Sequence, residues 1–145
     1  MLKLLSIFLI LNLQITKELR DKNPALFSNQ RLYHSPPDPL FKNRNHTLDF
    51  ITNIPKDSVI SATLFFKTDS MKYFREFELN GLHGHYQFFY EHKTYPGNYL
   101  QYYFIIKTNK GIHGIPINDK GWLIPTNNLL IDPVEYFKQQ TRLNK

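Results

Sequence analysis

Gly97-Asn-Tyr-Leu-Gln-Tyr-Tyr-Phe-Ile-Ile-Lys107 is the longest clean strand pattern in the sequence, and turn residues bound it on both sides. Successive side chains of a strand point to opposite faces of its sheet. One face is apolar or aromatic throughout (Leu100, Tyr102, Phe104, Ile106), and the other is mixed (Tyr99, Gln101, Tyr103, Ile105, Lys107). Such a strand needs partners in its own sheet and a second layer over its dry face. The segment therefore predicts the central strand of a layered β-protein.

The same two-residue alternation recurs in short segments separated by turn residues. The further predicted strands are 47–52, 58–67, 72–79, 86–90 and 112–117, with a last short strand within 122–125 and 129–131. In 58–67 one face carries Ile60, Ala62, Leu64 and Phe66. Pro116 makes 112–117 an edge strand or its end. Nine Tyr and twelve Phe also favour strands. The predicted fold is all-β, an antiparallel sandwich of about seven strands.

The length of 145 residues leaves room for one domain with a sizeable core. We divide the chain into a signal peptide or amino-terminal anchor (1–23), a proline-rich extended segment (24–45), the sandwich (46–131), and a short helix with a tail (132–145). The segment 24–45 carries four prolines and no apolar periodicity, as is typical of an extended tether.

The amino terminus has the pattern of a secretory signal, a basic start at Met1-Leu-Lys3 followed by an apolar run from Leu4 to Leu13. That run is shorter than the about 20 apolar residues that usually cross a bilayer. We therefore expect export to the periplasm, the cell surface or the medium. No small-x-small cleavage site follows the run, so an uncleaved, membrane-associated amino terminus is an open alternative. A buried core helix at the start of a cytosolic domain is another.

Composition excludes several classes of function. The chain has no cysteine, which rules out disulfides, thiolate catalysis and cysteine-ligated metal sites. Its formal net charge of +6 comes from basic residues scattered among acidic ones rather than gathered in a block. We therefore expect a solvated surface and no nucleic-acid partner.

The last residues change to a helical pattern. Asp132-Pro-Val-Glu135 has a capping side chain, a proline at the first helical position and an acid three residues after the cap. Val134 and Phe137, three residues apart, could dock this helix on the domain. The sequence predicts a short carboxy-terminal helix that begins after Asp132.

The run from Val59 through Pro116 resembles the immunoglobulin-like and fibronectin type III-like β-sandwich modules of secreted bacterial proteins. The segments that carry the resemblance are Ala62-Thr-Leu-Phe-Phe-Lys67, Tyr73-Phe-Arg-Glu-Phe77, Gly84-His-Tyr86, Pro96-Gly97 and Tyr102-Tyr-Phe104. The last three also resemble early-set sandwiches attached to glycan-active enzymes, some of which bind carbohydrate. The paired cysteines of antibody domains are absent. The resemblance implies a binding or spacer module, by analogy of fold alone.

Aromatic residues on the second faces of the strands are the candidate binding site. They are Phe65, Phe74, Phe89, Tyr99 and Tyr103, together with Trp122. A row of rings can stack on sugars or pack against a partner protein. The competing interpretation is that the strand aromatics form the other half of the core, or lie under the proline-rich segment or the terminal helix.

Chemical sites are weaker candidates. His83-Gly-His85 would put two imidazoles on one face of a strand, but a third ligand would have to come from elsewhere, such as His92 or His113, and no zinc motif accompanies the pair. Glu76 and Glu78 share a face with Lys72, as on a solvated strand. We predict no metal, no cofactor and no catalytic residues, and keep an unrecognised hydrolase around the histidines as a minor alternative.

The sequence thus predicts an exported, non-catalytic module that binds a protein partner at the cell envelope or outside the cell. Its alternative is a glycan-binding module that uses Tyr99, Tyr103 and Trp122 as a stacking platform. A membrane would be contacted only through an uncleaved amino terminus.

Overall fold

The computed structural model describes residues 31–144, so the predicted leader and the first part of the proline-rich segment lie outside the described residues. The elements are β1 (Leu32–His34), β2 (His46–Thr52), the 3-10 helix η1 (Lys56–Ser58), β3 (Val59–Thr68), β4 (Arg75–Glu78), β5 (His85–Tyr90), β6 (Tyr99–Thr108), β7 (Gly111–Ile115), β8 (Thr126–Leu129) and α2 (Pro133–Leu143).

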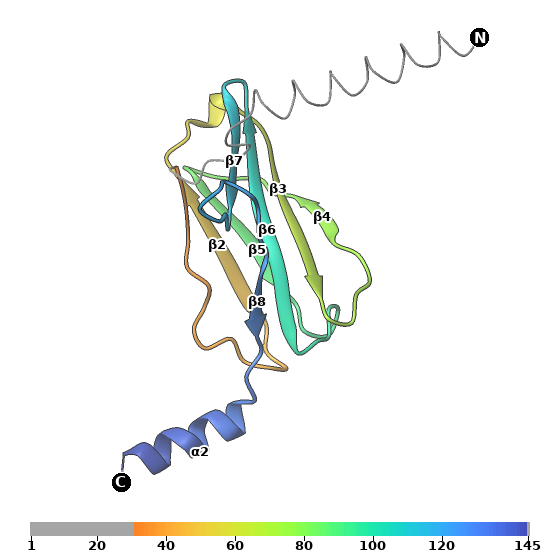
Figure 1. Ribbon diagram of the computed structural model, residues 1–145, viewed down its shortest axis with the longest axis vertical. Helices are drawn as coiled ribbons and strands as arrows, with labels where there is room; N and C mark the ends of the chain where they lie inside the picture. Colours follow the sequence, from red (N-terminus) through yellow and green to blue (C-terminus); the bar gives the residue numbers. More distant parts are fainter. Residues whose placement is uncertain (1–30, 145) are drawn as a thin grey trace, which may run out of the picture.

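The strands form two antiparallel sheets, which confirms the mostly-β prediction (Figure 1). The three-stranded sheet has the order β1-β2-β5, and the five-stranded sheet has the order β4-β3-β6-β7, with β8 also paired to β6. Strand β6 is central because β3 lies on one side of it, while β7 and β8 share the other side. The strand that the sequence marks as central is therefore central in the structure.

The core lies between the two sheets and consists of inward-facing alternate side chains. In β6, Leu100, Tyr102, Phe104 and Ile106 are all buried, as the alternation predicts. Rings from the two sheets meet directly, since Phe50 of β2 stacks on Phe104 of β6 with their centroids 4.6 Å apart. Packed aromatic and aliphatic groups thus fill the space between the two sheets.

One face assignment in β3 is wrong. Ile60 is 61% exposed, although the alternation places it on the face of Ala62, Leu64 and Phe66. The pairing with β6 shifts by one residue between Val59 and Ser61, which is a β-bulge. The bulge interrupts the alternation, so Val59 rather than Ile60 packs against the core.

The ends of several strands also differ from the predicted ones. The sequence predicts only an extended segment before His46, whereas Leu32–His34 forms β1 and pairs with β2. The predicted strand 72–79 is shorter, since β4 spans Arg75–Glu78. The last strand, β8, lies at Thr126–Leu129, so it overlaps the predicted stretches 122–125 and 129–131 only at Leu129.

Helix α2 begins as predicted, with Asp132 as its cap. The Asp132 side chain accepts hydrogen bonds from the backbone N–H groups of Val134 (2.8 Å) and Glu135 (3.2 Å). The predicted docking through Val134 does not occur, because Val134 and Phe137 are each 59% exposed. Phe137 touches only the rim of the domain through Phe41, at 5.8 Å between centroids, and the helix lies beyond one end of the sandwich (Figure 1). No helix among residues 31–144 is long and apolar enough to cross a membrane.

Candidate functional site

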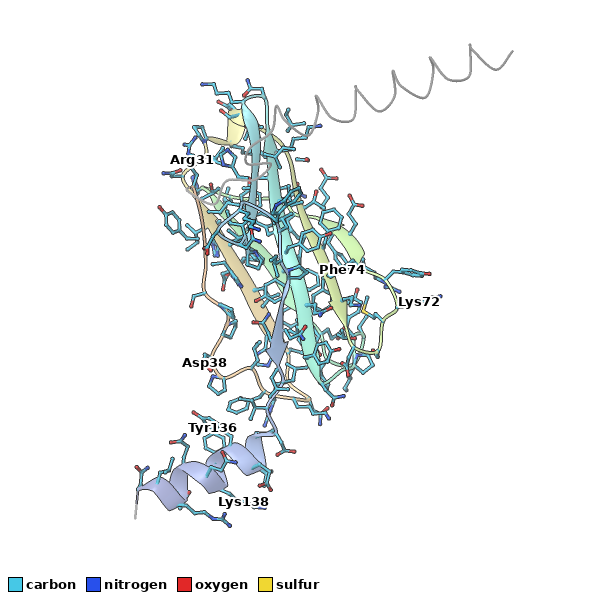
Figure 2. All side chains as sticks on the ribbon, viewed as in Figure 1. Arg31, Asp38, Lys72, Phe74, Tyr136 and Lys138 are labelled. Carbon is cyan, nitrogen blue, oxygen red and sulfur yellow. The ribbon has the colours of Figure 1, made fainter. Side chains whose placement is uncertain are left out.

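The outer face of the five-stranded sheet carries three of the predicted aromatic residues in direct contact. Phe65 of β3 is the cross-strand partner of Tyr103 of β6, and Phe74 lies just before β4. Figure 2 labels Phe74 on the β4 side of this sheet. We call Phe65, Phe74 and Tyr103 the aromatic cluster. All three side chains are half-buried, so they are not part of the inter-sheet core.

The rings of the cluster are turned toward one another. Phe65 and Tyr103 stack with their centroids 4.8 Å apart and 12° between their planes. Phe74 meets Tyr103 edge-on, at 5.3 Å and 61°. Because the two stacked rings cover each other's faces, the pair turns one face of each ring away from any ligand.

Charged side chains flank the aromatic cluster. The Lys67 ammonium lies 5.4 Å from the centre of the Phe74 ring, within the range of a cation–π contact. Glu76 is the cross-strand neighbour of Phe65 on the other side. Burial, together with the Glu76 carboxylate, raises the pKa of the Tyr103 hydroxyl, so this hydroxyl stays protonated at neutral pH.

Tyr99, the first residue of β6, lies on the same face of this strand as Tyr103. It pairs across the strands with Leu129 of β8, which is 64% exposed. Between Tyr99 and Tyr103, Gln101 donates a hydrogen bond to Asn127 of β8. Tyr99 and the cluster therefore share one sheet face, separated by an amide pair.

Phe89 is on the opposite side of the molecule, on the outer face of the three-stranded sheet. It is 61% exposed and pairs with Thr47 of β2. On the same face, Asp49 accepts hydrogen bonds at one carboxylate oxygen from His85 Nε2 and Gln87 Nε2, both at 2.8 Å. The bond from Gln87, with that from His85, lowers the pKa of Asp49. Phe89 cannot act together with the aromatic cluster on one ligand of ordinary size.

Trp122 lies in the loop between β7 and β8 and is 53% exposed. The loop is closed by Asn118, whose side-chain oxygen accepts from the backbone N–H groups of Lys120 (3.0 Å) and Trp122 (2.9 Å). No ring contact joins Trp122 to another aromatic residue within the described part of the chain. The structure thus unites three predicted site residues, places Tyr99 on their face, and leaves Phe89 and Trp122 apart.

A concave site, which the sequence does not reveal, opens at one side of the sandwich where β1 and β7 end. This edge groove has a volume of about 690 Å³. Its apolar walls are contributed by Leu32, Ile51, Ile115, Pro116 and Ile117, and its polar residues include His34, Asp49 and Tyr102.

His34 and Tyr102 form a polar pair beside the apolar core. His34 Nδ1 donates to the backbone carbonyl of Asp49 (2.6 Å), so Nε2 of the neutral ring accepts from the Tyr102 hydroxyl (2.7 Å). Burial lowers the pKa of His34, although the Asp49 carbonyl and charge act in the other direction. Burial disfavours the charged form of Tyr102 as well, and this raises the pKa of its hydroxyl. Both groups are therefore neutral at pH 7.

Of the two histidines considered as a metal-binding pair, His83 lies in the turn before β5 and His85 is the first residue of β5. His83 adopts a positive φ of 52° in a two-residue turn, and His85 is engaged by Asp49. Within residues 31–144, no three His, Asp or Glu side chains lie close enough together to hold a metal ion.

Comparison with known proteins adds no family. No family model matches the sequence, and no match to a curated protein was found.

Proposed function

We propose that this chain is an exported, non-catalytic interaction module of the immunoglobulin-like or fibronectin type III-like kind, and that the outer face of its five-stranded sheet binds a protein partner. The aromatic cluster carries this proposal. Phe65, Phe74 and Tyr103 place large, rigid apolar groups on a solvent-facing sheet surface, between Lys67 and Glu76. Aromatic residues within a polar rim are typical of protein interfaces.

The strand order supports the finer assignment of fold. The chain crosses from one sheet to the other between β2 and β3, between β4 and β5, and again between β5 and β6. Repeated crossing between two antiparallel sheets is the connectivity of Greek-key sandwiches, which arise without sequence similarity. Export is proposed from the amino-terminal sequence, the basic Met1-Leu-Lys3 and the apolar run after it.

A protein partner fits the cluster better than a sugar does. Sugars stack on open ring faces, whereas Phe65 and Tyr103 stack on each other and Phe74 is directed at Tyr103. Packed rings with exposed edges suit the side chains of a protein surface. The glycan-binding alternative draws support from Trp122, whose exposed indole makes no described ring contact.

The non-catalytic part of the proposal rests on where the polar groups lie. The histidine–carboxylate contact described for residues 31–144 joins His85 to Asp49 on an open sheet face. Each of these two side chains is 45% exposed. An acid–base pair is expected in a cleft that excludes water and holds a substrate. This pair instead resembles a surface network shared with Gln87.

The test is site-specific photo-crosslinking of the full chain in envelope and extracellular fractions of the source organism. A photoreactive phenylalanine analogue replaces Glu76, beside the cluster, or Gln87, an exposed position on the other sheet, as the matched control. We expect one protein to be crosslinked from position 76 and not from position 87, and Tyr103→Ala to remove that product. Crosslinking from position 87 alone would contradict the proposed face.

Glycan arrays decide between protein and sugar. The proposal expects no retention of the full chain on polysaccharides. Retention that is abolished by Tyr103→Ala or by Trp122→Ala, but not by Phe89→Ala, would replace the protein-partner proposal by the glycan-binding one. Each variant is first checked for an unchanged thermal transition, so that a lost signal reports binding rather than unfolding.

A further inference from the structure

The open edge of the five-stranded sheet adjoins the aromatic cluster. Strand β4 pairs with β3 on one side, and no described strand pairs with it on the other, so it forms a margin of its sheet (Figure 1). Leu79, which follows β4, donates its N–H to the Ala62 carbonyl of β3 (2.8 Å). Because hydrogen-bonded residues alternate along an antiparallel pair, the peptide groups of Glu76 and Glu78 point away from β3. This edge therefore presents the N–H and C=O groups of both glutamates to a further strand.

The outer side of this edge is acidic. Glu76 is the cross-strand neighbour of Phe65, and Glu78 that of Thr63, so both carboxylates project on the face of the aromatic cluster. Both residues are exposed, and neither carboxylate forms a hydrogen bond or an ion pair with the residues that the structure describes. The neighbouring Arg75 is turned to the inner side, where its guanidinium lies 5.7 Å from the centre of the Tyr95 ring. An added strand would thus meet two carboxylates on its outer side.

The inner side of the same edge is apolar. Phe77, between the two glutamates, faces the core, and its ring centroid lies 4.9 Å from that of Phe88 in the other sheet. Phe77 packs against the core but is only half-buried, and so is Tyr95, whose ring lies 6.1 Å away. An apolar side chain on an added strand would cover the exposed part of Phe77, which is a favourable burial of apolar surface.

We propose that the protein partner adds an extended strand to the β4 edge, and that this strand carries a basic, an apolar and a second basic residue in succession. The basic side chains lie opposite Glu76 and Glu78, and the apolar side chain lies opposite Phe77. Opposite charges directly across a strand pair are favourable and like charges are unfavourable. The edge therefore accepts a basic strand and disfavours pairing with β4 of a second copy. This inference rests on the proposed function, since it states how the partner of the aromatic cluster is bound.

The probe is the peptide acetyl-Thr-Lys-Val-Lys-Val-Thr-amide, titrated into the uniformly ¹⁵N-labelled full chain at pH 7. One control, acetyl-Thr-Glu-Val-Glu-Val-Thr-amide, has the opposite charge, and the other, acetyl-Thr-Lys-Lys-Val-Val-Thr-amide, has the same composition without the alternation. We expect saturable binding of the first peptide alone, with slower amide exchange at Glu76 and Glu78 and unchanged exchange at Gln87 and Phe89 on the edge strand of the other sheet. No saturable binding, equal binding of either control, or protection centred elsewhere would each overturn the proposal.

Substitutions separate the charge from the strand addition. Replacing both Glu76 and Glu78 by Gln should weaken peptide binding roughly two- to thirtyfold, as expected for the loss of two cross-strand charge pairs. Glu78→Pro removes an N–H that points away from β3, so it should leave β4 in place and abolish binding. Glu78→Thr, which keeps the N–H, should weaken binding only modestly, and Gln87→Pro at an exposed position of β5 should not change it. Each variant is first checked for an unchanged thermal transition. Unchanged affinity in the double Gln variant or in Glu78→Pro would refute the proposal.

Glu78→Pro also distinguishes this inference from the proposed function. In the crosslinking experiment with the photoreactive residue at position 76, Glu78→Pro should remove the product, as Tyr103→Ala does. A product that survives Glu78→Pro but not Tyr103→Ala would overturn strand addition and leave the binding face in place. Peptide binding at β4 without any crosslinked protein would instead support the edge as a strand-binding site and contradict the proposed function.

Discussion

The carboxylate of Asp69 accepts the backbone N–H of Asn98 at 2.7 Å and the side-chain amide of the same residue at 2.8 Å. These bonds join the turn after β3 to the loop that leads into β6. Pro96 strengthens the same link, since its carbonyl accepts from the hydroxyls of Thr68 (2.8 Å) and Ser70 (2.6 Å). The entry of the central strand is thus fixed by a turn almost thirty residues earlier in the chain.

Replacing Asp69 should loosen this link. Asp69→Ala leaves the Asn98 groups to water and should lower the free energy of unfolding by about 1 kcal/mol, since the site is exposed. Asp69→Asn keeps one acceptor oxygen and should cost less. Urea denaturation at pH 7 measures both. An Asp69→Ala protein as stable as the wild type would mean that these bonds are replaced by water at no cost.

The same hydrogen bonds predict an acid-sensitive contribution to stability. They lower the pKa of Asp69 in the folded state below its usual value of 3.8. The unfolded chain therefore binds a proton more readily, and stability falls as the pH drops below about 4. We expect the difference in stability between wild type and Asp69→Asn to be constant from pH 5 to 7 and to shrink below pH 4. A difference that stays constant down to pH 2 would contradict this assignment.

Gly97 is required by close packing rather than by its backbone angle. A Cβ at this position would lie 2.6 Å from Asp69 Oδ1 and 2.7 Å from the Thr68 Cβ. Gly97→Ala should therefore destabilise the protein by about 1–3 kcal/mol, as overpacking does. Measured in the Asp69→Ala background, where one of the two clashes is absent, the cost should be smaller. Equal costs in the two backgrounds would place the clash at Thr68 alone.

The half-buried His34 predicts a stability change between pH 5 and 7. Burial lowers its pKa in the folded state, so the unfolded state, with a pKa near 6.5, takes up a proton first as the pH falls. Stability should be full above pH 7 and decline below about 6.5. His113 acts in the same direction, because burial and the nearby Arg31 lower its pKa as well. Asp49 and Asp69 remain ionised throughout this window.

His34→Gln isolates the contribution of this histidine. The variant should be less stable at pH 7.5, since the stacking on Phe50 at 4.3 Å is lost, but its stability should vary less between pH 5 and 7. His83→Asn is the matched control, because it removes an exposed histidine at a positive φ that asparagine tolerates. Its pH profile should follow that of the wild type. A His34→Gln profile as steep as the wild-type one would show that other groups carry the dependence.

The Asp132 cap should matter locally and not globally. Asp132→Ala removes the acceptor for the first N–H groups of α2 and should cost about 1 kcal/mol of helix stability. Because α2 has no buried residue, the transition of the sandwich should stay where it is. Amide exchange in 133–143 should accelerate while exchange in β6 is unchanged. A lowered global transition would show that the helix is coupled to the sandwich.

Patterns of side-chain alternation could predict the strands but not their partners. The inner face of β6 is predicted correctly because burial of every second residue leaves a direct trace in the sequence. Ile60 is wrongly placed because a bulge changes register without changing composition. The three-residue β1 is too short to show a period of two.

The candidate site was only partly predictable for the same reason. Second-face aromatics can be identified from the sequence, but the contact between Phe65 and Tyr103 depends on the register of β3 on β6. The position of Phe89 on the other sheet depends on the pairing of β5 with β2. His34 and Tyr102 lie 68 positions apart in the sequence, and Tyr102 is indistinguishable from a core residue by its alternation. Contacts set by pairing between distant strands leave no local pattern.

A double-mutant cycle tests the ring stacking on which the proposed function depends. Phe65→Leu and Tyr103→Leu, measured singly and together, should show a coupling of about 0.5–1.5 kcal/mol in the free energy of unfolding, as stacked aromatic pairs do. The same cycle between Phe65 and Phe89 should give none, because these rings project from opposite sheets. If Phe65 and Tyr103 are uncoupled, their rings are free to turn their faces outward, and the stacking argument against a sugar ligand no longer holds.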